Sequence, residues 1–176
     1  MLVAALLLLG AMSLVLPQTA WATSSCSGTT TVTVSGSGVA FGNYDVMNAA
    51  ATPGTGTVTV SSTCNFNFSA SYTVDYVIAL STGSSGSFTP RSMTSGTSAL
   101  QYNLYTTAAL STIWGDGTGG TQTVSGSLTG SCQLVFFFYT CNTSVSQNYT
   151  AYGNIPAMQN IVAGSYTDSI TVTVSF

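Results

Sequence analysis

Four cysteines carry the most distinctive chemistry that this sequence offers. They stand at Cys26, Cys64, Cys132 and Cys141, and four cysteines permit three disulfide pairings. Cys26 precedes the first predicted strand and Cys64 ends the second, which favours a bridge between neighbouring strands. Only eight residues separate Cys132 from Cys141, which favours a local second bond. Zinc binding is the competing interpretation, but it needs close pairs such as Cys-x-x-Cys, which the sequence lacks. We therefore expect two disulfides and no metal or other cofactor.

Ionisable side chains are too few for most catalytic mechanisms. The 176 residues include one cation, Arg91, and no histidine, lysine or glutamate. General acid–base catalysis uses such groups in tuned environments, and a Ser-His-Asp triad is impossible without histidine. One arginine cannot neutralise a phosphate backbone, which argues against nucleic-acid binding. The sequence predicts a protein that is not an enzyme, with Arg91 in an ion pair with an aspartate. The aspartates are Asp45, Asp75, Asp116 and Asp168.

The N-terminal region has the pattern of an export signal. Residues 2–16 are almost wholly apolar and are followed by the small-residue sequence Ala20-Trp21-Ala22. This pattern predicts a signal peptide over residues 1–22 and one mature domain over residues 23–176. The apolar run is shorter than the ~20 residues of a membrane-spanning helix. We therefore expect an exported protein with no membrane span after signal removal.

Strands dominate the remainder of the sequence. Apolar and hydroxyl residues alternate with a period of two, which predicts strands with one buried face. Glycine-rich turns at 83–86, 115–117 and 119–120 separate them. The predicted strands cover residues 29–34, 57–60, 72–80, 100–105, 122–128, 149–155 and 170–176. Seven or eight short strands with such turns predict an all-β, immunoglobulin-like sandwich.

Several segments resemble, in order, a known family. They read VAFGNYD at 39–45, YVIALSTG at 76–83, Arg91-Ser92-Met93, LYTTAALSTIWGDG at 104–117, YGNIPAMQ at 152–159 and AGSYTDSITVTVSF at 163–176. Together they resemble spore coat protein U domains, which are similar to subunits of archaic chaperone-usher pili. The resemblance covers nearly all of the predicted mature chain.

The resemblance implies a sandwich that lacks its last strand. In such subunits a periplasmic chaperone fills the open groove before an outer-membrane usher assembles the fibre. The N-terminal segment of a neighbouring pilin subunit then replaces the chaperone by strand addition. The final strand suits a docking edge, because alternate residues share one face. These residues are Ile170, Val172, Val174 and Phe176. The alternative is an ordinary core strand in a complete sandwich.

The predicted mature start departs from the pattern of polymerising pilins. Cleavage after Ala22 leaves Thr23, Ser24 and Ser25 ahead of Cys26. Three residues reach about 10 Å, which is less than a typical strand of about five or six residues. This predicts a subunit that accepts a strand but cannot donate one, as at the distal tip of a fibre. The alternatives are that residues 29–34 donate, or that cleavage occurs elsewhere.

An insertion-like stretch, residues 131–147, carries six consecutive apolar or aromatic residues between Cys132 and Cys141. These residues are Leu134, Val135, Phe136, Phe137, Phe138 and Tyr139. Alternate side chains of a strand point to opposite faces, so the six cannot all face one core. We interpret the stretch as a disulfide-braced hydrophobic finger for adhesion. A strand buried on both faces is the alternative.

Three function classes follow from these patterns. The leading class is a pilus subunit or tip adhesin assembled by a chaperone and usher, with a role in adhesion and biofilm. The second is a spore-coat or surface-layer protein assembled without an usher. An enzyme on a β-sandwich is the least favoured, because titratable groups are so few.

Overall fold

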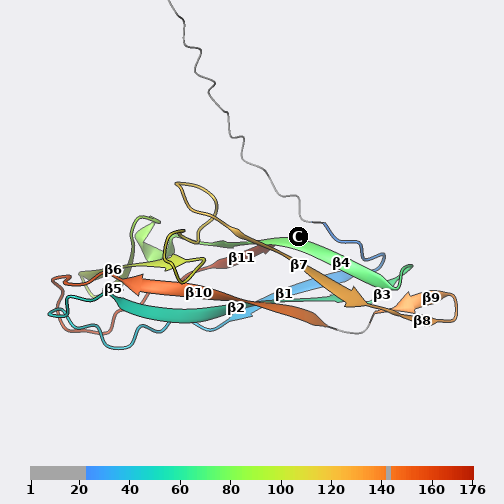
Figure 1. Ribbon diagram of the computed structural model, residues 1–176, viewed down its shortest axis with the longest axis horizontal. Coiled ribbons are helices and arrows are strands. Elements are labelled where there is room, and N and C mark those ends of the chain that lie inside the picture. The colour runs from blue at the N-terminus through green and yellow to red at the C-terminus, as the bar shows by residue number, and fades with distance from the viewer. Residues whose placement is uncertain (1–22, 142–143) are drawn as a thin grey trace, which may run out of the picture.

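The computed structural model describes residues 23–141 and 144–176 (Figure 1). The predicted signal peptide, residues 1–22, lies outside the described residues. Within them the chain is all-β, which confirms the predicted fold class, and the helical structure is a single 3₁₀ turn, η1 (Gly83–Ser85). None of the described helical structure is long and apolar enough to span a membrane.

Eleven strands form in the described residues. They are β1 (Thr30–Gly36), β2 (Thr52–Cys64), β3 (Phe66–Asn67), β4 (Ser71–Leu80), β5 (Arg91–Ser95), β6 (Ser98–Tyr105), β7 (Val124–Ser131), β8 (Gln133–Val135), β9 (Phe138–Thr140), β10 (Val145–Ile155) and β11 (Val172–Ser175). All the paired strands are antiparallel. The predicted strands are all present, although β2 and β10 begin earlier than expected.

The strands form two main sheets and one small sheet. The first sheet has the order β1-β2-β10-β6-β5, and the second has the order β11-β4-β7. The small sheet, β3-β9-β8, extends beyond them at one end of the molecule (Figure 1). The two main sheets pack face to face, and their inward side chains form the core between them.

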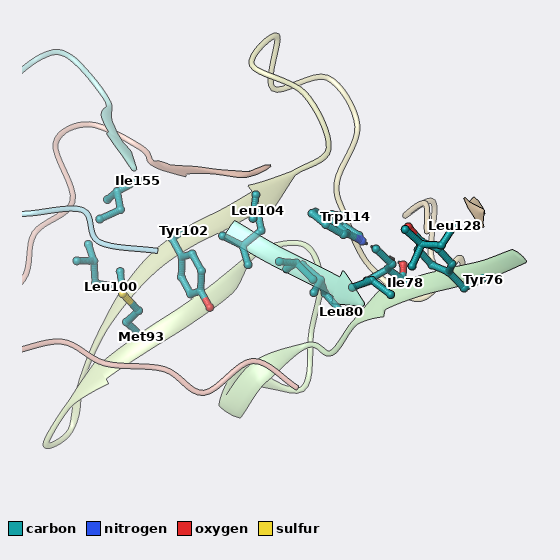
Figure 2. Packing of buried hydrophobic residues seen from close by; sticks show 13 residues of the cluster. Tyr76, Ile78, Leu80, Met93, Leu100, Tyr102, Leu104, Trp114, Leu128 and Ile155 are labelled. Carbon is teal, nitrogen blue, oxygen red and sulfur yellow. Dashed lines mark hydrogen bonds between the residues drawn. The ribbon is translucent and has the colours of Figure 1, made fainter. Parts of the chain in front are cut away.

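Period-two alternation explains how the two layers form. In β4, the alternate residues from Tyr72 to Leu80 are buried, and those between them are exposed or half-buried. Trp114, which precedes β7, is also fully buried and donates its indole N–H to the carbonyl of Ile78 at 3.2 Å. Figure 2 shows this side chain in the core close to Ile78. The core is therefore built largely by sequence alternation and completed by one loop residue.

Arg91 connects the two main sheets. Its side chain is fully buried at the start of β5, in the first sheet. It donates hydrogen bonds to the carbonyls of Ser81, just after β4, and Trp114, and to Oδ1 of Asn103. Burial lowers the pKa of Arg91, and attraction to Asp168 opposes this effect. The predicted ion pair is replaced by hydrogen bonds to neutral oxygens.

Candidate functional site

A groove runs between one edge of the first sheet and one edge of the second. One wall is formed by the end of β1 and residues 37–46, and the other by residues 161–170 and the start of β11. The groove contains two hollows of about 990 Å³ and 400 Å³. They adjoin each other, because both are lined by Val39, Phe41, Met93 and Tyr166.

The floor of the smaller hollow is apolar. Its lining includes inward-facing residues of β2, β4, β6 and β10, so the groove opens directly onto the core. These residues are Val58, Leu80, Leu104 and Ala151. An apolar floor between two sheet edges can receive the apolar side chains of an added strand.

The wall that follows β1 stays attached to β2 while its apolar side chains turn inward. Ala40 forms a β-bridge with Thr55, and the ring of Phe41 packs edge-on against Tyr102 at 5.8 Å between centroids. Gly153 provides room for this packing, since a Cβ there would lie 2.6 Å from the Phe41 ring. The wall is therefore part of the fold.

The opposite wall ends in β11, the predicted docking strand. β11 pairs with β4 on one side, from Val172 opposite Leu80 to Ser175 opposite Val77, and it is the last strand of its sheet. Ile170, Val172 and Val174 are half-buried against the core, and Phe176 is exposed. Ile170 and Val172 also line the groove. Their role in docking remains a proposal.

Asp168 anchors the segment that leads into β11. Its carboxylate accepts hydrogen bonds from the Tyr102 hydroxyl at 2.7 Å and from the backbone N–H and hydroxyl of Ser84 at 2.8 and 2.7 Å. It also accepts one from the Ser169 N–H at 2.8 Å. Burial tends to raise the pKa of Asp168, but these hydrogen bonds outweigh it and the pKa is lowered. The charged carboxylate therefore holds the groove wall in place.

The residues ahead of Cys26 pair with their own chain. The Ser25 N–H donates to the carbonyl of Thr73, and the Asp75 N–H donates to the carbonyl of Thr23, both at 2.9 Å. Ser24 bridges Val74 in the antiparallel sense. These residues therefore lie along the same edge of β4 as β11, just beyond the end of that strand.

The predicted hydrophobic finger is a short hairpin of β8 and β9. Its turn is Phe136-Phe137, whose side chains are 87% and 97% exposed, and Phe136 adopts a left-handed backbone conformation with φ of 59°. Leu134 and Val135 are also exposed, and Tyr139 packs against a small core beneath. The aromatic turn thus projects into solvent.

One exposed aromatic residue near this hairpin was not predicted. β3 pairs with β9, with Phe66 opposite Thr140 and Asn67 opposite Tyr139. Phe68 follows directly and is 74% exposed, and its ring packs edge-on against Phe66. The sequence alone does not pair β3 with the hairpin, because 65 residues separate Asn67 from Gln133, where the hairpin begins.

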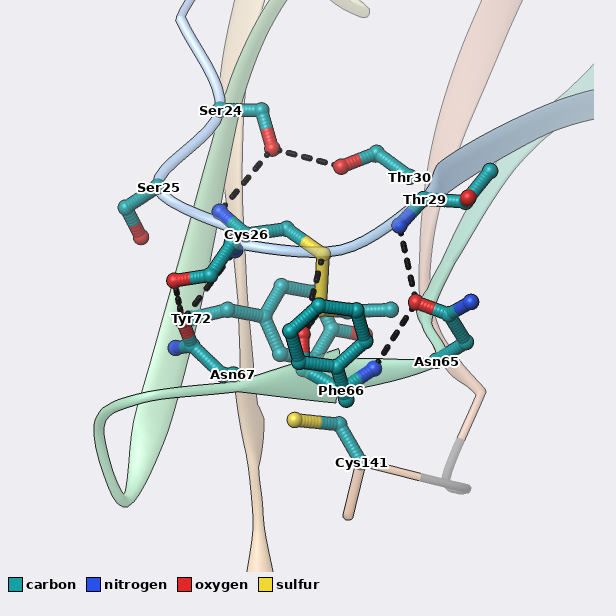
Figure 3. The surroundings of a disulfide bond; sticks show 12 residues. Ser24, Ser25, Cys26, Thr29, Thr30, Asn65, Phe66, Asn67, Tyr72 and Cys141 are labelled. Carbon is teal, nitrogen blue, oxygen red and sulfur yellow. Dashed lines mark hydrogen bonds between the residues drawn. A yellow bond between two sulfur atoms is a disulfide. The ribbon is translucent and has the colours of Figure 1, made fainter. Parts of the chain in front are cut away.

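Two disulfides support the base of the hairpin. Cys26 is bonded to Cys64 and Cys132 to Cys141, which are the pairings that the sequence favoured. Figure 3 shows Cys141 near the first bridge, below the ring of Phe66. Cys64, Cys132 and Cys141 are buried in one small cluster with Tyr72. The hairpin therefore rises from a cross-linked base.

Comparison with known families identifies the relationship of the chain. A family model described as the Spore Coat Protein U domain matches residues 13–173. The chain belongs to this family. The Spore Coat Protein U match confirms the resemblance inferred from the motifs, and the two disulfides are typical of exported proteins.

One solved structure is similar to this Spore Coat Protein U domain. It is the CsuC-CsuE chaperone-tip adhesion subunit pre-assembly complex from archaic chaperone-usher Csu pili of Acinetobacter baumannii. The matched chain is 19% identical, with a TM-score of 0.47, and the alignment covers 84% of the present chain and 40% of that chain. The present chain thus spans less than half the length of that chain. No curated protein matches the sequence.

Proposed function

We propose that this chain is a non-catalytic subunit of a chaperone-usher-type surface pilus that accepts a strand from another chain. The observation that carries the proposal is the groove beside β11, the last strand of its sheet. A strand added there gains main-chain hydrogen bonds from β11 and inserts alternate side chains over an apolar floor. The family membership supports the same role.

The partners in this proposal act in sequence. A periplasmic chaperone fills the groove after export, an outer-membrane usher receives the complex, and a neighbouring pilin subunit then supplies the permanent strand. In the present chain the apolar floor of the groove is formed by Val58, Leu80 and Leu104. These three side chains are buried, so an added strand covers mainly the half-buried Val39 and Phe41 beside them, and it stabilises the folded subunit by binding to it.

Thermal unfolding with an added peptide tests the groove. The probe is a synthetic peptide of alternating valine and threonine with lysines at its ends. The midpoint of unfolding should rise with peptide concentration, because the peptide binds the folded chain. The control peptide has the same composition with its valines in one block, which breaks the match to alternate pockets.

A variant of the groove wall completes this test. Ile170→Asp places a charge on the wall, so it should abolish the rise while the chain still folds, as judged by circular dichroism. Thr171→Asp is the matched control, because Thr171 is exposed on the other side of the same segment. A midpoint that is unchanged by the alternating peptide would contradict the proposal. Assembly into a surface layer without an usher would then be favoured.

We further propose that the subunit sits at the distal fibre tip and adheres through the hairpin. Exposed aromatic turns release ordered water when they contact an apolar surface, and each Phe ring can bury about 150–250 Å². Thr23 and Ser25 hydrogen-bond to β4 of their own chain, so they are not free to act as a donor strand. The hairpin and these intramolecular bonds support a terminal position.

Adhesion is tested by substituting the turn. Phe136→Ser with Phe137→Ser should leave folding and secretion unchanged and should remove retention on polystyrene, because both rings are exposed. Met47→Ser is the matched control, since Met47 is 85% exposed and is not part of the hairpin. Equal retention of all variants would contradict adhesion by the hairpin. Gold-labelled antibody along the fibre shaft, instead of at its end, would contradict the tip position.

A further inference from the structure

The two main sheets have four lateral edges, and three of these are accounted for. β1 and β11 border the groove. β5 is partly covered, because Thr167 exchanges two backbone hydrogen bonds with Thr94 at 3.0 and 3.1 Å. The fourth edge is β7, which pairs only with β4 among the strands of the described residues.

Residues 124–130 of β7 lack the features that usually protect a sheet edge. Natural edges carry charged residues, proline or bulges that prevent pairing with another chain. This segment reads VSGSLTG, with no charge and no proline. Its register against β4 is regular, from Ile78 opposite Val124 to Tyr72 opposite Gly130, so there is no bulge. The edge therefore presents a straight row of backbone donors and acceptors.

The first sheet, which packs against the sheet of β7, is also open on the β7 side of the sandwich. β10, in the first sheet, packs against β7. One edge of β10 pairs with β6 along the second half of β10, and no described strand pairs with that edge along the first half. The pairing with β6 covers Tyr152–Asn154 only. No described strand therefore covers this side of the sandwich along either layer.

Electrostatic repulsion does not prevent two such edges from meeting. Arg91 is buried, and the nearest charge to the edge is Asp75, which lies opposite Ser127 on β4. In two copies paired through β7, three strand spacings separate the two Asp75 positions, or about 14 Å. That distance exceeds the Debye length of about 8–10 Å near physiological salt.

The side-chain pattern of β7 matches itself in one antiparallel register. When Ser127 lies opposite Ser127 of a second copy, Leu128 meets Gly126 and Val124 meets Gly130 on the inner face. Large residues then lie opposite glycines. On the outer face, Ser125 meets Thr129, and both are exposed. Cross-strand pairs of this kind determine which register is stable.

We propose that β7 pairs with β7 of a second copy of this chain about a two-fold axis at Ser127. The pairing joins the two three-stranded sheets into one sheet of six strands. The same surface is used on both copies, as in any two-fold interface. This inference goes beyond strand acceptance in the groove and does not depend on it. Along a fibre, repeated contacts of this kind would join neighbouring fibres side by side.

Single cysteine variants of the full exported chain test the register. Ser127→Cys should form a disulfide-linked dimer under mild oxidation, because opposed residues of antiparallel strands lie about 4.5–5.5 Å apart between Cα atoms, within disulfide range. Ser61→Cys on the outer face of β2 is the control, because β2 is paired on both sides. We expect Ser127→Cys to cross-link at least about ten times faster, a difference equivalent to about 1.4 kcal/mol. Equal rates would overturn the proposal.

A variant without a new cysteine gives an independent readout. The unchanged chain should show a concentration-dependent shift from monomer to dimer in analytical ultracentrifugation. Ser127→Lys should remove the shift because it places two like charges opposite each other, whereas Ser61→Lys on β2 should retain it. A chain that stays monomeric at every concentration, or that dimerises equally with Ser127→Lys, would overturn the proposal.

Discussion

Replacing Arg91 tests how the two main sheets are held together. This side chain is fully buried, and it links β5 of one sheet to the carbonyl of Ser81 at the end of β4 in the other. Arg91→Met keeps a similar length but removes every donor. The carbonyls of Ser81 and Trp114 and Oδ1 of Asn103 then each lose a hydrogen-bond partner.

The size of the effect follows from these contacts. A hydrogen bond to a charged group contributes about 1.5–3 kcal/mol, and breaking a buried polar cluster from one side costs about 3–5 kcal/mol. For a domain of this size, each kcal/mol lowers the melting midpoint by about 2–4 °C. Arg91→Met should therefore lower the midpoint by about 6–20 °C. Arg91→Lys should also be destabilising, because one ammonium cannot reproduce the planar fork of the guanidinium.

Differential scanning calorimetry measures this change. Ser92→Met is the control, because Ser92 is the next residue of β5 and is only half-buried. A midpoint for Arg91→Met within about 2 °C of the unchanged chain corresponds to less than about 1 kcal/mol. Such a result would refute the idea that this arginine joins the sheets.

Three further predictions concern the groove wall and the disulfides. Folding lowers the pKa of the Asp168 carboxyl below its value in the unfolded chain, which is about 4. The carboxylate therefore stabilises the fold at pH values above about 4, and this stabilisation should be lost as the pH falls from about 4 toward the pKa of the folded state. Asp168→Asn should flatten that part of the pH profile of the melting midpoint. Replacing both cysteines of Cys26–Cys64 by serine should lower the free energy of unfolding in urea by about 4 kcal/mol, and the same change at Cys132–Cys141 should lower it by about 3 kcal/mol, because the first disulfide closes the longer loop. Equal decreases for the two variants would contradict this order. Gly153→Ala should lower the free energy of unfolding by about 1–3 kcal/mol, because the new methyl group crowds Phe41. An unchanged urea midpoint would show that the groove wall can move away from this methyl group without loss of stability.

Weak local patterns explain why β5 and the first half of β2 are not predicted from the sequence. β5 reads RSMTS, which begins with the buried arginine and has one fully apolar residue, so its alternation is weak. The first half of β2 contains Pro53, Gly54 and Gly56, residues that usually end or weaken a strand. Long-range pairing overrides these local preferences, because β10 pairs with β2 along its whole length.

Some features of the candidate sites could be predicted from the sequence, and others depend on contacts between distant segments. The sequence favoured both disulfide pairings and located the apolar run between Cys132 and Cys141, because residue types and their spacing are local properties. It did not predict that Phe68 stands near the hairpin, since that depends on the pairing of β3 with β9. It also could not assign the acceptors of Arg91, which are two carbonyls and an amide contributed by distant segments.

The sequence by itself determined the strand-rich class, the small number of charges and the alternation of buried and exposed positions. These properties depend on residue type and on a period of two along the chain, which are local. Only the tertiary structure decided which strand edges remain open, because an edge is defined by the absence of a neighbouring strand. The groove beside β11 and the edge of β7 at residues 124–130, which no other described strand pairs with, both arise from the order of strands within the sheets. That order depends on contacts between residues far apart in the chain.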